Sequence, residues 1–323
     1  SQSRRPGGSS RATSALAAAT RTAARSAISS CAFLAGCSAA VGTFNANTGT
    51  GNQSVTGVGF QPKIVIFFDS VGNTSTGNTV NAVYSMGVAV SSTKRGSMAT
   101  FSTDAANPTT CSTAISSTKC MTRNSVSAIT FAADLVSMDA DGFTINITTA
   151  SGTSMSWGYI ALGGNISVDV GAFTQKTSTG TNATTGVGFL PEFLSTFSPG
   201  MTTADDTINT TADAHVAVGA ANSTASRWGY AAFEDDNVAT TVDGRVLSAS
   251  AIAEHISGTT PTLNAEADLS SFDSDGFTLN WTTADGTARK WIYWALKDAT
   301  PAGGTVGVGL TSSLRLERLR LAA

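Results

Sequence analysis

The sequence has few charged residues and only two histidines. Charged residues make up 13% of the 323-residue chain, and His215 and His255 both lie in its second half. A lone histidine is more often a structural or surface residue than a general base. No G-x-S-x-G elbow, phosphate-binding loop or H-E-x-x-H motif is present. We therefore expect no catalytic residues and no enzyme activity.

Long apolar runs and closely spaced cysteines are missing as well. No stretch approaches the ~20 apolar residues of a transmembrane helix, so we expect no membrane span. The four cysteines lack C-x-x-C spacing, which together with the scarcity of histidine argues against a zinc site. Cys111 and Cys120 bracket a Ser/Thr-rich loop, and pairing between them is left open. No metal or other cofactor is expected.

The charges are distributed unevenly along the chain. Residues 41–310 hold 11 basic and 21 acidic residues, a net charge of −10. Residues 301–323 form a second, C-terminal arm with three arginines. Residues 1–40 contain no acidic residue, and we interpret them as a basic arm that contains Arg4, Arg5, Arg11, Arg21 and Arg25. Phe33 to Cys37, "FLAGC", resembles a lipoprotein cleavage site, but the apolar stretch before it is short and rich in serine.

The two arms suggest a partner with an acidic surface, and another copy of the body offers one. Nucleic acid is the competing partner, because five arginines can neutralise phosphates. We rank it lower, since the arginines are spread over 22 positions and the acidic body would be repelled by phosphate. We expect the arm to lie on another subunit.

The body of the chain repeats itself. "VGTF" at Val41 returns as "VGAF" at Val170, and "TGVGFQP" at Thr56 returns as "TGVGFLP" at Thr185, both 129 positions later. "AADLVSMDADGFTIN" at Ala132 returns as "EADLSSFDSDGFTLN" 134 positions later. The second copy therefore has five extra residues between Thr185 and Glu266. We expect one repeat over residues 41–164 and another over residues 165–300, in contact with each other.

Each repeat has the pattern of antiparallel β structure. Phe143, Ile145 and Ile147 alternate with polar residues, and Gly- and Asx-rich turns follow. "KIVIFF" at Lys63 is a continuous apolar run, which is typical of a strand covered on both faces. We therefore predict an all-β fold of two tandem antiparallel β-sandwich, jelly-roll-like domains with extended N- and C-terminal arms.

The repeated D-x-D-G sequence is either a calcium site or a tight turn. Its residues are Asp139, Asp141 and Gly142 in the first repeat and Asp273, Asp275 and Gly276 in the second. An EF-hand requires a glutamate at the twelfth position of the loop, where this chain has Ala150 and Ala284. We therefore predict metal-free tight turns, with the first aspartate of each pair accepting backbone N–H groups.

These spaced motifs resemble a β-sandwich domain found in structural proteins of tailed bacteriophages. The resemblance covers residues 41–298 and excludes the arms. The matching positions are Gly59, Phe60, Pro62, Asp139, Asp141, Gly142 and Phe143, and in the second repeat Gly188, Phe189, Pro191, Asp273, Asp275, Gly276 and Phe277. "PEFLSTF" replaces the apolar run in the second repeat. The resemblance implies a virion component, assembled in the host cytoplasm, and it supplies no catalytic residues.

Two further groups of residues have competing interpretations. The acidic clusters Asp205–Asp206 and Glu234–Asp236 are either paired acids or solvated loops, and we favour solvated loops. The aromatic candidates for sugar binding are Trp228, Tyr230, Trp291 and Trp294. Trp291 and Tyr293 share one face and are expected in the core, with Trp294 exposed or at the join between repeats.

A structural role accounts for most of these features. We expect a head-decoration or tail-associated protein whose partners are other copies of itself and other virion proteins. The alternative is a tail-fibre or adhesin module that binds a host-surface glycan. A long fibre usually shows coiled-coil heptads or a fibrous repeat, and the sequence contains neither.

Overall fold

The structure is a computed structural model that describes residues 36–70, 81–103, 106–202, 206–210, 213–239, 242–258 and 260–299. These residues contain 21 strands and no helix, and the paired strands are antiparallel. The prediction of an all-β antiparallel fold is confirmed. The described part of the chain contains no helix capable of crossing a membrane. The arm residues Arg4, Arg5, Arg11, Arg21 and Arg25, and all of residues 301–323, lie outside the described residues.

The first half of the chain forms a large sheet and a small one. The large sheet contains β1 (Cys37–Ala46), β10 (Met155–Gly164), β3 (Pro62–Ser70), β4 (Asn81–Ala89), β5 (Arg95–Thr103) and β6 (Cys111–Ser116), in that spatial order. The small sheet contains β2 (Gly51–Thr56), β9 (Gly142–Thr149), β8 (Ile129–Asp139) and β7 (Met121–Asn124). A short strand from the second half, β14 (Thr207–Asn209), pairs with β6 and extends the large sheet to seven strands.

The second half forms a matching pair of sheets. Its large sheet contains β11 (Ile166–Thr174), β21 (Lys290–Asp298), β13 (Phe193–Ser198), β15 (Ala214–Ala221), β16 (Arg227–Glu234) and β17 (Asp243–Ser248). Its small sheet contains β12 (Gly180–Thr185), β20 (Gly276–Thr283), β19 (Thr262–Asp273) and β18 (Ala253–Ser257). Apart from β14, strand order is the same in the two halves.

Strand register locates the extra residues of the second half. On β3 and β13, the equivalent residues Phe67 and Thr196 are 129 positions apart. The offset rises to 132 for Ala89 and Ala221 on β4 and β15. It reaches 134 for Ala133 and Ala267 on β8 and β19. Three residues are therefore inserted between β13 and β15, and two between β18 and β19. The first insertion lies in the connection that contributes β14 to the other half.

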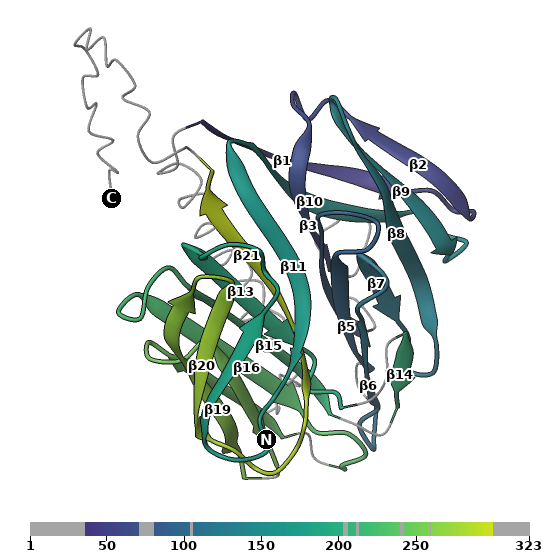
Figure 1. Ribbon diagram of the computed structural model, residues 1–323. Coiled ribbons are helices and arrows are strands. Elements are labelled where there is room, and N and C mark those ends of the chain that lie inside the picture. Colours follow the sequence, from purple (N-terminus) through teal and green to yellow (C-terminus); the bar gives the residue numbers. More distant parts are fainter. Residues whose placement is uncertain are drawn as a thin grey trace, which may run out of the picture.

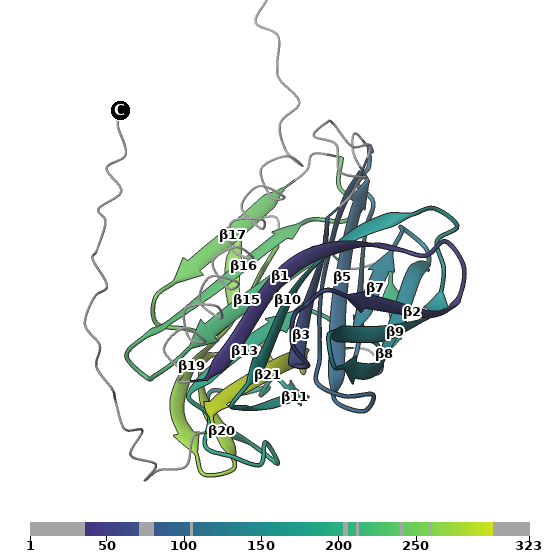
Figure 2. The ribbon, with the colours of Figure 1, turned by 90° about the horizontal axis from the view of Figure 1, so that it is seen from above.

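The four sheets stack as layers separated by three apolar cores. One core lies inside each half, between its large and small sheets, and the third lies between the two large sheets. The halves lie side by side in Figure 1, coloured purple to teal and green to yellow. Figure 2 shows the small sheet of the first half, with β2, β7, β8 and β9, on the side of its large sheet that faces away from the second half.

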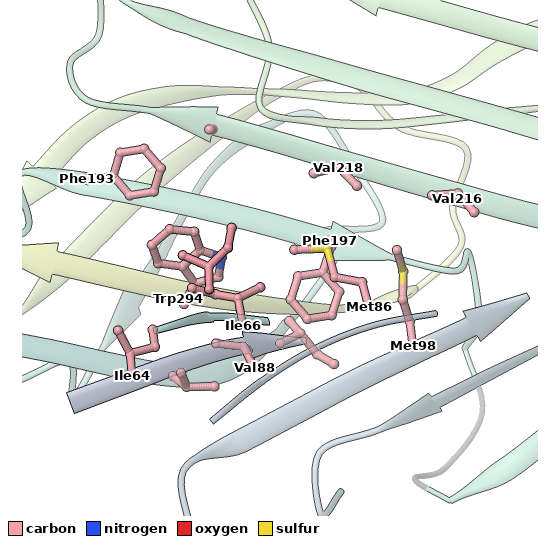
Figure 3. Close-up of a cluster of buried hydrophobic side chains, with 14 of the residues drawn as sticks. Ile64, Ile66, Met86, Val88, Met98, Phe193, Phe197, Val216, Val218 and Trp294 are labelled. Atoms are coloured by element: carbon pink, nitrogen blue, oxygen red, sulfur yellow. The ribbon is translucent and has the colours of Figure 1, made fainter. Parts of the chain in front are cut away.

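The central core joins the two halves through large apolar side chains (Figure 3). Its largest member from the second half is Trp294, which is 2% exposed and contacts Phe193 at a ring-centroid distance of 4.8 Å. The side chains that meet there are Ile64, Ile66, Met86, Val88 and Met98 from the first half and Phe193, Phe197, Val216, Val218 and Trp294 from the second. Trp294 therefore lies at the join, and Trp291 and Tyr293 lie in the core of the second half.

Burial on two faces explains the apolar run in β3. Ile64 and Ile66 point into the central core, and Val65 and Phe67 point into the core of the first half. The less apolar counterpart, β13, is also buried throughout. The Ser195 hydroxyl donates to the Gly219 carbonyl at 2.9 Å, and the Thr196 hydroxyl donates to another backbone carbonyl, so the buried polar groups are satisfied.

Strand β1 is the first strand of the first half. It starts at Cys37, four residues before the boundary expected at residue 41. Ala40 and Phe44 pack against the core of the first half, so residues 37–40 belong to the sandwich rather than to the arm. The second half begins with β11 at Ile166, directly after the end of β10 at Gly164.

Candidate functional site

The repeated D-x-D-G sequence forms a two-residue turn between β8 and β9. Asp139 pairs with Gly142, and Ala140 and Asp141 make the turn. The Asp141 carboxylate accepts the backbone N–H of Gly57 at 3.1 Å and that of Gly59 at 2.6 Å. The second aspartate of the pair therefore fastens the loop after β2, the "TGVGF" segment, to the end of the β8–β9 hairpin.

The first aspartate has a different role from the one that the sequence suggested. Asp139 was expected to accept backbone N–H groups, but its carboxylate instead accepts the hydroxyls of Ser137 and Thr144, each at 2.6 Å. These two hydrogen bonds favour the ionised carboxylate and lower its pKa. The expectation failed because two hydroxyl donors, on Ser137 and Thr144, lie beside the carboxylate and occupy both of its oxygens.

The second half repeats this corner. The Asp275 carboxylate accepts the N–H groups of Gly186 at 3.0 Å and Gly188 at 2.7 Å. The Asp273 carboxylate accepts the hydroxyls of Ser271 and Thr278, each at 2.7 Å. The motifs that repeat along the sequence are thus the two partners of one hydrogen-bonded corner, built twice.

The glycine of each corner is required by close backbone contact. Gly142 has φ +151°, and a Cβ there would lie 1.9 Å from the carbonyl oxygen of Val55 on β2. Gly276 has φ +150°, and a Cβ there would lie 1.9 Å from the carbonyl oxygen of Thr184 on β12. Only glycine lets the edge strand approach this closely.

The third repeated motif packs beside the same corner. In "VGTF", a Cβ on Gly42 would lie 2.4 Å from the Tyr159 hydroxyl, so the glycine makes room for the tyrosine ring. The Phe44 ring contacts the Phe143 ring at 6.0 Å, and the Phe143 ring lies edge-on to the Tyr159 ring at 5.3 Å. The corner and the aromatic core of each half therefore form one structural unit.

The aspartates of both corners are engaged with protein donors. Each of their eight carboxylate oxygens accepts a hydrogen bond from a hydroxyl or a backbone N–H. Across the described ranges, no group of three or more His, Cys, Asp or Glu side chains is arranged to hold a metal ion. The hydrogen bonds of each corner hold a loop against the end of a hairpin, which is a structural role.

The acidic loop at Glu234–Asp236 contacts the other half, and the prediction that this loop is solvated is wrong. Glu234 and Asp235 are buried. Asp236 accepts the backbone N–H of Cys111 at 2.6 Å, and the Asp235 carbonyl accepts the Thr109 hydroxyl at 2.7 Å. Burial, reinforced by Asp213, raises the pKa of Asp235.

The other acidic cluster also reaches across the join. Asp206 accepts the hydroxyls of Ser116 and Thr118, which lie in the first half, and Asp205 lies outside the described residues. Local sequence gave no sign of these contacts, because both partners lie about 90 to 125 positions away. Asp206, Asp235 and Asp236 therefore all make hydrogen bonds with residues of the first half.

The two histidines lie against each other in the second half. His215 on β15 and His255 on β18 are buried, with ring centroids 4.1 Å apart. Arg289, ion-paired with Asp285 at 2.6 Å, supplies a positive charge nearby. Burial first, and then Arg289, lower the pKa of His255 to about 3, and burial lowers the pKa of His215 well below its usual value. Such histidines are neutral and inaccessible at pH 7, which makes them poor general bases.

The candidate sugar-binding aromatics are mostly buried. Trp291 and Trp294 lie in cores, and Tyr230 is also buried, so only Trp228 of the four is partly exposed. The thiols of Cys111 and Cys120 are free and buried, so the pairing left open for them does not occur. Burial raises the pKa of Cys111 to about 12, which leaves it protonated and unreactive.

Comparison with known proteins gives no relative. No protein-family model, no curated protein and no solved structure matches the chain.

The corner glycine generates a prediction about stability. Replacing Gly142 by alanine should lower the free energy of unfolding by about 3 kcal/mol or more, because the new Cβ overlaps a backbone carbonyl. The matched control is Gly152→Ala, at φ +73° with no atom within 4 Å of the added Cβ. It should cost about 1–2 kcal/mol, the conformational penalty alone. Urea unfolding of both variants measures the difference, and equal costs would contradict the close approach of β2.

The histidine pair generates a prediction about acid stability. Because both pKa values are lower in the folded protein than the usual 6.5, protonation favours unfolding, and stability should fall as pH drops below about 6.5. Each histidine contributes a slope of up to about 1.4 kcal/mol per pH unit. His215→Val, which copies the residue at the equivalent position 83 of the first half, should make the fall less steep.

Glu254 provides the control for this measurement, because its effect on the pH dependence of stability is opposite to that of the histidines. Burial raises its pKa to about 7, so its protonation stabilises the folded protein as pH falls from 7 towards 4.5. Glu254→Gln should therefore make the acid-induced loss steeper. The free energy of unfolding is measured from pH 7.5 to 5, and an unchanged slope in His215→Val would refute the role of the pair.

Proposed function

We propose that this protein is a non-enzymatic structural component of a tailed-phage virion, at the particle surface, either as a head-decoration (cement) protein or as a tail-associated protein. The main support is that the motifs resembling the phage β-sandwich domain form the same hydrogen-bonded corner in both halves. The matching residues thus have one role, to fix the fold of each half.

The use of the polar residues favours a building block over an enzyme. Acidic residues fasten corners or hold the halves together, the histidines are buried in a neutral pair, and both free thiols are inaccessible. An active site normally presents such groups to a cleft. Here they are buried or engaged in hydrogen bonds within the protein instead.

The alternative of glycan binding has weaker support. Sugar sites on β-sandwiches use exposed aromatic rings, and Trp228 is the one partly exposed ring among the four candidates. The partly covered ring of Trp228 alone offers little surface on which a sugar could stack. A host-surface glycan is therefore kept as the second candidate.

Incorporation into particles tests the proposal. In virions that carry the gene, deletion of residues 1–35 should abolish incorporation while leaving a folded body, because the arm is the basic segment and β1 begins only at Cys37. Arg→Gln substitution of Arg4, Arg5, Arg11, Arg21 and Arg25 should have the same effect, and Arg→Lys substitution should retain most of the incorporation, since it preserves the charge.

The possible results distinguish the virion assignment from the anchoring role of the N-terminal arm. Mass spectrometry and labelled electron microscopy of purified particles measure occupancy and position. Absence of the intact protein from the particles would overturn the virion assignment. Normal occupancy of the deletion variant would keep the assignment but transfer the anchoring role to residues 301–323.

A further inference from the structure

The large sheet of the second half ends in a strand whose outer edge is open. β17 is the last strand in the order β11–β21–β13–β15–β16–β17, and no strand pairs with its far side in the described part of the chain. The corresponding edge of the first half, on β6, is paired with β14, and Thr207 of β14 lies opposite Ile115. An open edge presents unpaired N–H and C=O groups, to which another extended segment can pair.

Leu247 makes this edge apolar as well as open. Its side chain is 73% exposed, the highest value among the large apolar side chains of the described residues. Leu247 lies opposite Tyr230 on β16, and Tyr230 belongs to the core between the two large sheets. Because opposite residues of an antiparallel pair point to the same face, Leu247 lies at the border of that core. A strand beside β17 would cover Leu247 and extend the core.

Residues 305–316, in the C-terminal arm, have the sequence pattern of a strand that needs a partner. Their sequence, "TVGVGLTSSLRL", has apolar residues at every second position except Ser312, namely Val306, Val308, Leu310, Leu314 and Leu316. This period of two predicts a strand with one apolar face. Gly307 and Gly309 weaken a strand that stands alone, so we expect this segment to pair with an existing edge.

The C-terminal segment leaves the sheet at the end from which β17 can be reached. The described chain ends at residue 299, directly after β21, and 24 residues follow. Every pair from β21 through β13, β15 and β16 to β17 is antiparallel, so β17 and β21 finish at the same end of the sheet. Four strand spacings, about 19 Å in all, separate these two strands. Residues 299–304 span about 20 Å when extended, so residue 305 can lie beside Ser248.

Charge favours the same strand direction. A strand that starts beside Ser248 and runs antiparallel to β17 carries its later residues past Asp243, towards the loop between β16 and β17. That end is acidic, since burial first, and then the charges of Asp213 and Asp243, raise the pKa of Asp235. Arg245 is the one basic residue of β17. The end of the C-terminal segment is basic and has, against a single Glu317, the residues Arg315, Arg318 and Arg320. Opposite charges therefore meet when the added strand is antiparallel.

We propose that residues 305–316 add a seventh strand to the second large sheet of their own chain, antiparallel to β17 and with their apolar side chains over Leu247. The short linker after β21 keeps the local concentration of the segment at its own β17 high, which favours this edge over that of another copy. A closed edge also protects the sheet from edge-to-edge association with other chains. The inference does not depend on the virion assignment, and it leaves residues 1–35 as the segment available to a partner.

Hydrogen exchange of the outward-directed amides of β17 tests the added strand. These amides should exchange at least about tenfold more slowly in the full chain than in a chain that ends at residue 300. Within the full chain, Val308→Asp should remove the protection, because it places a charge on the apolar face of the segment. Thr311→Asp is the matched control, since position 311 lies on the opposite face, and it should retain most of the protection. Equal exchange in the full and shortened chains, or equal effects of the two substitutions, would overturn the proposal.

Disulfide cross-linking identifies the neighbour of Leu247 and the chain that supplies it. Leu247→Cys is combined in turn with Val306→Cys, Val308→Cys and Leu310→Cys, and one of these pairs should cross-link, because paired strands bring Cα atoms within the reach of a disulfide. The combination with Gly309→Cys should not cross-link. The reaction is run on an equal mixture of ¹⁵N-labelled and unlabelled protein, and mass spectrometry should find both cysteines of each cross-link with the same label. Cross-links of mixed label would show that another copy supplies the strand and would contradict the proposal, as would the absence of any cross-link.

Discussion

Burial of two large sheets against each other is the constraint on which the rest of this structure depends. A sandwich normally needs one apolar face on each sheet, but β3 and β13 lie between two cores and must be covered on both sides. Side chains such as Ile66 and Trp294 are buried only because the other half is present. Each half therefore completes the other, and the short connection between β10 and β11 keeps their local concentration high.

Polar contacts at the rim fix how the halves meet. The apolar core is not directional, whereas the contacts of Asp206 with Ser116 and Thr118, and of Asp236 with the Cys111 N–H, each have one geometry. Strand β14 adds a backbone pairing that crosses the join. Together they select one arrangement of the two similar halves, where an apolar surface alone would allow several.

Sequence predicted the parts of the fold that rest on local patterns. Alternation in Phe143, Ile145 and Ile147 located a strand with one buried face, and the unbroken run at Lys63 located one buried on two. The Asp-Gly pairs located the turns, because Asp and Gly favour tight turns, although the close approach of β2 and β12 that requires these glycines could not be predicted. These patterns depend only on residues that lie within a few positions of one another in the sequence.

Contacts between segments that are distant in the sequence could not be predicted from such local patterns. The clusters at Asp206 and Glu234 read as solvated loops, since nothing in their own sequence reveals a hydroxyl or an N–H presented by the other half. The contact between His215 and His255 depends on β15 and β18 lying together, although the two residues are 40 positions apart in the chain. The repeat did reveal equivalent residues, but only the structure shows that Val170 is buried whereas its equivalent Val41 is exposed.

Native-state hydrogen exchange tests the central claim, that the two halves are one cooperative unit, most directly. Amides of β3 in the first half and β13 in the second should exchange only through global unfolding, with the same opening free energy and the same dependence on denaturant. A lower opening free energy for β13 and β15 than for β3 and β4, with its own denaturant dependence, would show that the second half opens independently and would contradict the account.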